Sequence, residues 1–447
     1  GSIRTGMCGG AASGVCAAAA IPYSASLPGS ASSHSSGSKS SGRSSRSASS
    51  SASSSAYLSG DQTWNDAVTL GADTTLTVDV GTSSLKAVLY DNRAQVVDKA
   101  TERYEYEAKH PGWAEGDPHT WWQALQDALA TLGRRCDLGA VKAMSFTGQM
   151  HSAVLLDQDG EVIPPTILWL DRRASKETEE LQELLGLPPY QLNSTYTLPK
   201  LLWLRRNEPD VLDRTKTILW PKDYLRYRLT GEVCTDLTEP GGAALLDWST
   251  RTYTKERLEL VGLDAGVLPP IRGAAANAGT ILPDVANSVG LSPDVRAVVG
   301  MGDVAALFGA APLKSGRVIC SLGSSSMVFA PFDQESHVQD AKHRLHVYPF
   351  GPYPLVGGVS STTGAALVWV CKLCDGRSFQ DSVEDALAVD PGSGGVAFIP
   401  YLAGERNPYW NDDIRGGFYG LALAHGHAHL VRAVVEGVAY SLRHFLD

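Results

Sequence analysis

Residues 74–91 read TTLTVDVGTSSLKAVLYD, and this stretch decides the fold that the sequence predicts. Apolar and polar residues alternate through TTLTVDV, a Gly-Thr-Ser turn follows, and KAVLYD resumes the alternation, so a hairpin of two antiparallel strands is expected. A second copy of the pattern, RVICSLGSSSMVFAP, begins at Arg317 in the later half of the chain. We therefore expect two related units that face one another, each built on a strand, a glycine turn and a second strand.

Helical segments alternate with strands around these hairpins. DPHTWWQALQDALATL at 117–132 has apolar residues at helical spacing, with Asp117 as the expected N-cap. WPKDYLRYRLTGE at 220–232 predicts a helix that ends at Gly231, and VKAMSFTGQMHSAVLLD at 141–157 predicts a buried strand, a turn and another strand. Strands that first pair as hairpins and then alternate with helices favour a mixed sheet with helices on its faces, an α/β fold.

Composition limits the function classes. The chain has 447 residues, of which 43% are hydrophobic and 19% charged, with a formal net charge of −10. This length favours two domains plus tails. The negative charge argues against a nucleic-acid surface, and no apolar run is long enough to span a membrane. Seven scattered cysteines favour a reducing compartment over a disulfide framework.

Two motifs with metal-binding residue types are expected to be structural. Cys371 and Cys374 form a CxxC inside TTGAALVWVCKLC, which has the apolar stripe of a helix, so core packing is favoured. HGHAHL gathers His425, His427 and His429, but only the first and third would share a helical face. No acid nearby completes a metal site there.

The N-terminal segment differs from the rest of the chain. Residues 1–60 are rich in Ser, Ala and Gly and contain no Asp or Glu. Such a composition cannot bury enough apolar surface to offset chain ordering, so residues 1–70 are predicted to be disordered. The Ser and Arg content also resembles a transit peptide, which leaves a plastid or the cytoplasm as the location.

Two acids and two glycine turns suggest phosphoryl transfer. Asp79 lies at the first turn, and Asp303 follows Gly300-Met301-Gly302 ahead of a predicted helix. Backbone N–H groups in a Gly/Ser/Thr turn can cradle phosphate oxygens, one carboxylate can hold Mg²⁺, and another can accept the proton of an attacking hydroxyl. Ordinary turn chemistry, with Asp303 as a helix cap, is the structural alternative.

Gln149-Met150-His151 lies in a turn between two predicted strands. Gln and His side chains can hydrogen-bond to sugar hydroxyls, and Met can supply an apolar wall. A purely structural histidine is the alternative.

At this point the motifs resemble a family. VDVGTSSLKAVLYD, FTGQMHSAVLLD, ILWLDRRA, WPKDYLRYRLTGE and GERNPYWNDDIRGGFYGL are similar, in order from about Thr74, to segments of the FGGY carbohydrate kinases. The resemblance implies two ribonuclease-H-like domains of the actin and hexokinase ATPase type with a central cleft. Residues 71–296 would form the sugar-binding domain and 297–447 the nucleotide-binding domain. The second domain is expected to be incomplete, because the family continues with a further Gly-rich segment and closing helices.

The resemblance also implies roles for the motif residues. ATP and Mg²⁺ would be the cofactors, with Asp79 organising the metal and Asp303 acting as the catalytic base. The sugar would contact Gln149, Met150, His151 and Asp303. The phosphates of ATP would lie against Asp79, Gly81, Thr82, Ser83, Gly323, Ser324 and Ser325.

Within the family the early motifs most resemble xylulokinases, which implies phosphorylation of D-xylulose to D-xylulose 5-phosphate. A small-molecule sugar is then the expected partner, and a homodimer is left open. Val304 stands where Asn usually follows the catalytic acid, Leu170 replaces another Asn, and GERNPYW leans toward gluconokinases. A kinase for gluconate, ribulose or another sugar, and a sugar-binding pseudokinase or truncated inactive product, therefore remain alternatives.

Overall fold

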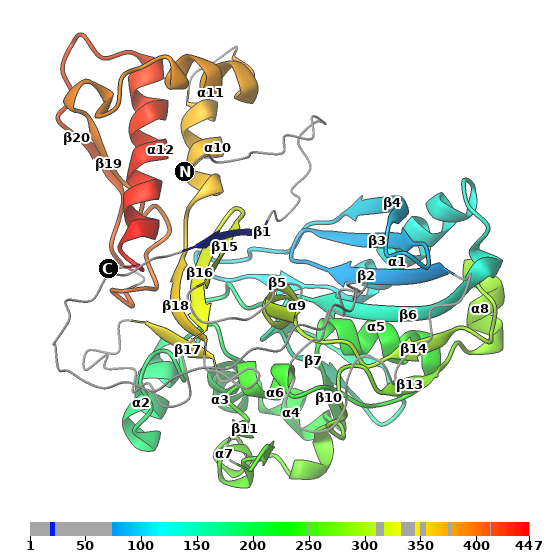
Figure 1. Cartoon of the computed structure of the whole chain (residues 1–447). Coiled ribbons are helices and arrows are strands. Elements are labelled where there is room, and N and C mark those ends of the chain that lie inside the picture. Colours follow the sequence, from blue (N-terminus) through cyan, green and yellow to red (C-terminus); the bar gives the residue numbers. More distant parts are fainter. Residues whose placement is uncertain are drawn as a thin grey trace, which may run out of the picture.

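The computed structural model describes residues 18–22, 74–248, 250–309, 317–331, 345–348, 355–373, 377–411 and 413–446. Its two largest sheets have six strands and five strands. Figure 1 shows them as separate parts of the molecule, with helices around both. The first is coloured blue to green, and the second is mainly yellow with the dark blue strand β1 at its edge. Each sheet contains one of the two predicted hairpins, so the expected α/β fold with two related units is confirmed.

The six-stranded sheet has the order β13-β14-β6-β2-β3-β4. β2 pairs antiparallel with β3 and parallel with β6, which makes the sheet mixed, as predicted. Leu76, Val78 and Val80 alternate into the core, and this period of two gives β2 its buried face. The strands are β2 (Thr74–Val80), β3 (Ser84–Tyr90), β4 (Val96–Arg103), β6 (Val141–Gly148), β13 (Asn277–Thr280) and β14 (Arg296–Val298).

Helices cover this sheet and share its apolar core. The Asp117 side chain accepts a hydrogen bond from the His119 backbone N–H, which confirms the predicted N-cap. Gly231 ends the 220–232 helix with a φ of 74°, a left-handed conformation that glycine adopts without a Cβ penalty. The helices are α1 (Pro118–Gly133), α5 (Pro221–Thr230) and α8 (Pro283–Val289).

Most of the chain between β6 and β13, together with the earlier strand β5 that pairs with β9, forms a region with its own apolar core around Ile218 and Trp220. Figure 1 shows these mostly green elements below the two sheets. Its strands are β5 (Glu115–Gly116), β7 (Val154–Leu156), β8 (Val162–Ile163), β9 (Thr166–Ile167), β10 (Thr217–Leu219), β11 (Leu246–Asp247) and β12 (Thr252–Tyr253). Its helices are α2 (Ser175–Leu185), α3 (Thr197–Asn207), α4 (Pro209–Arg214), α6 (Thr238–Gly242) and α7 (Lys255–Glu259).

The five-stranded sheet has the order β1-β15-β16-β18-β17, with every neighbouring pair antiparallel. Helices α10 and α12 and the ribbon β19–β20 enclose a separate core that includes Val370 and Phe398. The strands are β15 (Arg317–Leu322), β16 (Ser326–Pro331), β17 (His346–Tyr348), β18 (Leu355–Ser360), β19 (Ala397–Ile399) and β20 (Gly417–Tyr419). The helices are α9 (Asp303–Gly309), α10 (Gly364–Lys372), α11 (Phe379–Leu387) and α12 (His427–Arg443).

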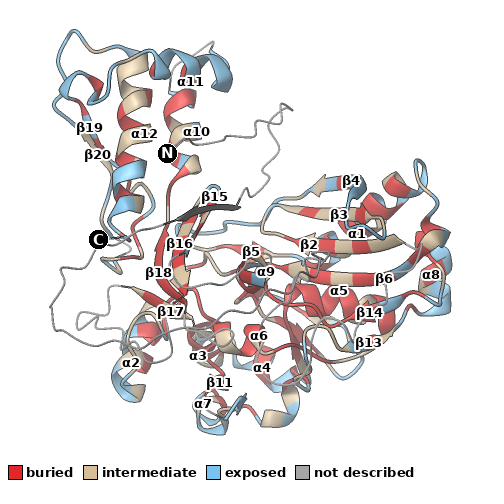
Figure 2. Ribbon diagram, viewed as in Figure 1, coloured by how far each residue is buried: buried red, intermediate tan, exposed pale blue. Residues whose placement is uncertain are grey.

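Burial follows this layered arrangement. Figure 2 shows buried residues concentrated in the strands of both sheets and exposed residues along the outer helix α11. Cys371 is buried in the core beside α12, as predicted, while Cys374 lies outside the described residues. Among the described helices, none is both long and apolar enough to cross a membrane.

The boundary predicted after residue 296 is a few residues too early. β14 begins at Arg296 and pairs in parallel with β6, so it belongs to the six-stranded sheet through Val298. Met301 and Phe308 instead pack with the core of the five-stranded sheet. The chain therefore passes from one unit to the other between Val298 and Met301, where an apolar strand gives way to glycines.

Within residues 1–70, for which the sequence predicts disorder, the structure describes one short segment. β1 (Ala18–Pro22) pairs antiparallel with β15 at the edge of the five-stranded sheet. An edge strand offers unpaired N–H and C=O groups, and any extended segment can bond to them through its backbone. Residues 1–17 and 23–73 lie outside the described residues.

Candidate active site

Asp79 lies next to the last residue of β2, where the strand meets the first glycine turn. Its side chain is 35% exposed and lies 3.4 Å from the Lys86 ammonium group on the paired strand. Burial raises the pKa of Asp79, and the nearby Lys86 charge opposes that rise. The carboxyl group is therefore partly withdrawn from water but still reachable from solvent.

Side chains from other segments hold the turn that follows. The Gly81 carbonyl oxygen accepts hydrogen bonds from the Tyr104 hydroxyl at 2.6 Å and from the Gln149 amide at 3.2 Å. The Trp169 indole N–H donates to the Thr82 hydroxyl at 2.8 Å. Residues 81–83, of which Ser83 is exposed, are thus fixed in place from three directions.

Asp303 is the first residue of α9. Its carboxyl accepts a hydrogen bond from the Val304 backbone N–H at 2.7 Å, and the residue is exposed, although surrounding protein atoms displace part of the water around the carboxyl. Loss of water around the carboxyl, and secondly the negative charge of Asp79, raise the pKa of Asp303 to about 7. The structure therefore brings the two predicted acids within electrostatic reach of one another.

Met150 and His151 follow β6 on the same side of the molecule. Met150 is 4% exposed, and a Cβ on Gly302 would lie 2.5 Å from its side chain, so Met150 sits directly against the segment that carries Asp303. His151 bonds through Nδ1 to the Gly242 carbonyl oxygen and packs against the Tyr196 ring, with ring centroids 4.9 Å apart and an angle of 34° between the ring planes. Burial lowers the pKa of His151 to about 3, so the imidazole is neutral at physiological pH.

Gln149 differs from its two neighbours. It is 2% exposed, and its amide donates to Gly81 while its carbonyl oxygen lies 3.5 Å from the Ser152 hydroxyl. Both ends of the side chain are thus used within the protein. Its expected contact with a sugar stays a prediction, and the structure shows it supporting the first turn.

The second turn, residues 323–325, connects β15 to β16 and is largely exposed. The Gly364 N–H donates to the Gly323 carbonyl oxygen at 2.9 Å, and the Thr363 N–H donates to the Ser324 carbonyl oxygen at 2.9 Å. In the described part of the chain, the hydrogen bonds of this turn go to the start of α10 or stay within the turn. No direct bond there joins it to either acid.

The second unit adds three side chains that sequence reasoning did not assign. The Arg406 guanidinium lies 5.8 Å from the centre of the Trp169 ring, and its charge helps lower the pKa of His151. Burial raises the pKa of Tyr348 to about 12, with Asp303 contributing to the rise. His346 stacks on Tyr348 at 5.2 Å. GERNPYW was visible as a motif, but nothing local indicated that its arginine reaches the first unit.

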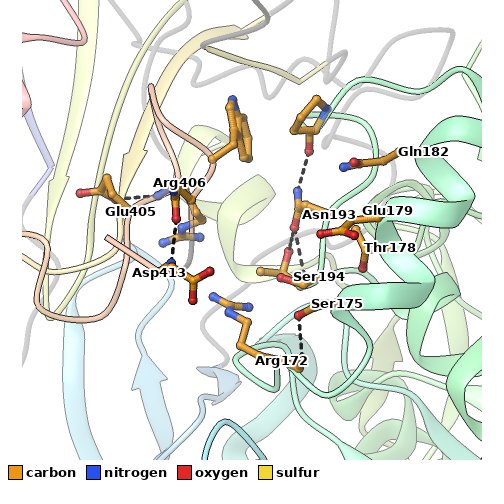
Figure 3. A pocket seen from close by; sticks show the side chains of 14 residues that line it. Arg172, Ser175, Thr178, Glu179, Gln182, Asn193, Ser194, Glu405, Arg406 and Asp413 are labelled. Carbon is orange, nitrogen blue, oxygen red and sulfur yellow. Dashed lines mark hydrogen bonds between the residues drawn. The ribbon is translucent and has the colours of Figure 1, made fainter. Parts of the chain in front are cut away.

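A pocket of about 430 Å³ lies beside Arg406, between the two units. Figure 3 shows Arg406, Glu405 and Asp413 on one side and residues of α2 on the other. Glu405 fixes its own side by accepting hydrogen bonds from the Ser360 hydroxyl at 2.9 Å and the Ser361 N–H at 2.6 Å. The rest of the lining is rich in amides and hydroxyls, including Thr178, Gln182, Asn193, Ser194 and Asn411.

The residues present fit a magnesium ion that arrives with a nucleotide. Among the described residues, no group of three or more His, Cys, Asp or Glu could hold a metal by itself, and the three histidines of HGHAHL are no exception. Mg²⁺ in phosphoryl-transfer sites takes one or two carboxylates and fills its remaining positions with phosphate oxygens and water. Asp79 supplies such a carboxylate.

Two α/β units, one glycine hairpin turn in each, and two acids within electrostatic reach form the arrangement that the sequence predicts for a phosphoryl-transfer enzyme. Comparison with known families takes the assignment further. Residues 74–309 match the N-terminal domain of the FGGY family of carbohydrate kinases, and residues 318–447 match its C-terminal domain. The chain belongs to the FGGY family, so it is a carbohydrate kinase that uses ATP as phosphate donor.

Individual relatives agree with this family. A xylulose kinase from Klebsiella pneumoniae is 34% identical over 377 residues, which cover 83% of this chain and 77% of that protein. The crystal structure of a "xyloylose kinase" from Brucella ovis has a TM-score of 0.73 at 33% identity, covering 83% of this chain and 78% of that one. A gluconate kinase from Lactobacillus acidophilus has the same TM-score at 27% identity, covering 83% and 76%.

Proposed function

We propose that the chain phosphorylates D-xylulose at its terminal hydroxyl, with Asp303 as the general base. The observation that carries this proposal is the setting of Asp303, where burial and, secondly, the charge of Asp79 raise the pKa of the carboxyl to about 7. A general base works best when its pKa lies near the operating pH. The 34% identity to a xylulose kinase supports the choice of sugar.

In the proposed reaction the sugar hydroxyl oxygen attacks the γ-phosphorus of ATP. The new O–P bond forms as the bond to the β,γ-bridging oxygen breaks, ADP leaves, and Asp303 takes the hydroxyl proton. Asp79 would hold Mg²⁺, which neutralises phosphate charge when bound. Backbone N–H groups of the 81–83 and 323–325 turns would position the phosphates, because catalysis of this kind rests on positioning and electrostatics.

The sugar would lie on the first unit, in reach of Asp303. Neutral His151 would receive a hydroxyl at Nε2, because its Nδ1 is engaged with the Gly242 carbonyl. Met150 would form an apolar wall. Tyr348 and Arg406 would close the site from the second unit, where the nucleotide is expected to bind.

Gluconate is the second candidate substrate. The charge of Arg406 near His151 would favour a sugar carboxylate, and a gluconate kinase is among the similar structures. Val304 packs against the apolar core of the second unit and offers no hydrogen bond to a ketose. A panel of xylulose, ribulose and gluconate in a coupled ADP assay would decide between them.

The direct test of the proposal is Asp303→Ala. Turnover should fall by about 10²- to 10⁴-fold, because the general base is lost, while sugar binding measured by calorimetry stays near its original strength. Asp303→Asn is the matched control for side-chain volume and should lose a similar amount. Near-normal turnover in either variant would remove Asp303 from the role of base.

A further inference from the structure

We propose that Thr238 is a positioning residue for Asp303. We also propose that α6 fixes the position of Asp303 relative to Met150 and His151, the predicted sugar contacts. This inference rests on the proposed function of Asp303. It concerns a residue that touches neither acid, and it follows from a continuous line of buried hydrogen bonds.

The chain of buried hydrogen bonds begins at Gly302, the residue before Asp303. The Gly302 backbone N–H donates to the Thr238 hydroxyl oxygen at 2.9 Å, and the Thr238 hydroxyl donates to an Asp236 carboxylate oxygen at 2.6 Å. Thr238 and Asp236 are each 1% exposed. The hydroxyl is thus donor and acceptor at once, which fixes its rotation and the position of Gly302.

Asp236 is itself held by a buried ion-pair cluster in α5. The Lys222 ammonium group lies 3.0 Å from Asp236 and 2.7 Å from Asp223, and all three side chains are almost completely buried. Removing one partner of such a cluster leaves an uncompensated charge, so the cluster has little freedom to shift. It therefore provides a rigid anchor for Thr238.

The same cluster also holds Val299, at the other end of the segment 299–302 that leads to Asp303. Arg226 pairs with Asp223 at 2.6 Å and donates to the Val299 carbonyl oxygen at 2.7 Å. Residues 299–302 are therefore tied at both ends to the first unit, although α9 packs into the core of the second. The ties fix the base at the point where the chain passes between the units.

The end of α6 contacts the predicted sugar side chains. The Gly242 carbonyl oxygen bonds to His151, and a Cβ on Gly242 would lie 2.7 Å from His151 and 2.8 Å from Met150. One short helix therefore touches the segment before Asp303 at one end and both sugar contacts at the other. A displacement of about 1 Å in such a constellation can cost about 10²-fold in rate.

The pH profile offers a second readout. Asp79, Glu239 and Tyr348 interact electrostatically with Asp303, and burial raises the pKa of Glu239 well above its usual range. An Asp303 released from its place would gain water and move away from Asp79. Its pKa would then fall, so the acid limb of turnover would shift to lower pH.

The test uses the full chain with Thr238→Val, Thr238→Ser and the control Thr215→Val. Thr215 directly follows α4, is 3% exposed, and its hydroxyl donates to the Val211 carbonyl oxygen at 2.8 Å. The control therefore removes a buried hydroxyl outside the site. We expect Thr238→Val to lower kcat by about 10- to 100-fold with a change of less than about threefold in the sugar KM. Its acid limb should shift downward, and deuterium exchange of a peptide covering 299–306 should accelerate. Thr238→Ser should keep kcat, the acid limb and the exchange rate close to those of the unaltered chain.

Three outcomes would overturn the inference: an unchanged kcat and acid limb in Thr238→Val, an equal loss in Thr215→Val, or no restoration by Thr238→Ser. If Thr238→Val fails to fold, Thr238→Ala removes the same acceptor without adding a buried methyl group, and the same criteria apply. Absence of sugar kinase activity in the unaltered chain would contradict the proposed function instead, while the exchange measurement on 299–306 would still test the tie between Thr238 and Gly302.

Discussion

The two hairpin turns have similar sequences but are held in different ways. The 81–83 turn is fixed by side chains from distant segments, with Tyr104 and Gln149 on the Gly81 carbonyl and Trp169 on Thr82. The 323–325 turn is fixed mainly by backbone N–H groups at the start of α10. Only the first carries an acid. From this difference we propose different tasks for the two turns: the first would align reactive groups, and the second would receive a phosphate tail.

The difference between the two turns predicts that the largest loss of turnover will come from a substitution at Asp79. Asp79→Asn should reduce turnover by on the order of 10³-fold, because the carboxylate that would hold the metal beside the phosphates is lost. Steady-state kinetics with varied Mg²⁺ would measure this, and the metal concentration for half-maximal rate should rise. Ser84→Ala, at the start of β3 beyond the same turn, serves as a control that keeps the acid. Equal turnover of Asp79→Asn and Ser84→Ala would contradict the division of tasks.

A smaller effect is expected where a single side chain holds the first turn. Trp169→Phe keeps most of the ring but removes the N–H that bonds to Thr82, a contact with a net value of about 1 kcal/mol, or roughly fivefold in rate. The loss should appear in kcat for the sugar reaction. Trp203→Phe on α3 is the matched control. If Trp169→Phe and Trp203→Phe have the same kcat, the indole N–H of Trp169 does not align the turn.

The second turn should tolerate the equivalent change better. The Thr363 hydroxyl lies 3.0 Å from the Gly323 carbonyl oxygen, but backbone N–H groups of 363–365 also hold this turn. Thr363→Val should therefore raise the KM for ATP by about threefold, with little effect on kcat, because the contacts of this hydroxyl with Gly323, Ser324 and Ser326 are lost while the backbone hydrogen bonds remain. Initial rates with varied ATP would measure it. A loss in kcat larger than that of Trp169→Phe would reverse the comparison.

Much of this arrangement followed from local sequence, and the remainder depended on contacts between distant residues. Alternating residues predicted both hairpins, and Asp117 and Gly231 predicted the ends of their helices. Thr238 and Gly302 are 64 positions apart, and no periodic pattern links them. The same holds for Arg406 and Trp169, whose contact exists only because two separately folded units meet.

The boundary and the N-terminal strand were missed for a related reason. The alternation in RAVVGMGD predicts a strand but does not indicate which sheet receives it, and β14 joins β6 by parallel pairing. Likewise, β1 forms because β15 has an open edge, which is a property of the sheet and not of residues 18–22.

The smallest predicted effect concerns the pH dependence that the two acids share. Asp303 must be deprotonated to act as a base, so turnover should fall as the pH drops through about 7, the pKa that burial and Asp79 give to Asp303. Asp79→Asn removes the secondary cause, so the acid limb of its residual turnover should move downward by less than about one unit. Burial, the primary cause, remains.

As the pH rises, Asp303 should contribute less to folding stability but more to turnover. This difference distinguishes a pH profile set by the ionisation of Asp303 from one set by unfolding. The folded protein keeps the Asp303 proton up to about pH 7, whereas an ordinary Asp releases it near 3.8, so between these values the folded state binds more protons. Rising pH therefore weakens the contribution of Asp303 to folding while it increases turnover. Rates measured from pH 5 to 9, beside thermal unfolding of the same samples, should diverge in this way, and Asp303→Asn should abolish both trends. A fall in turnover at low pH that tracks unfolding would show that stability, and not the ionisation of Asp303, sets the limb.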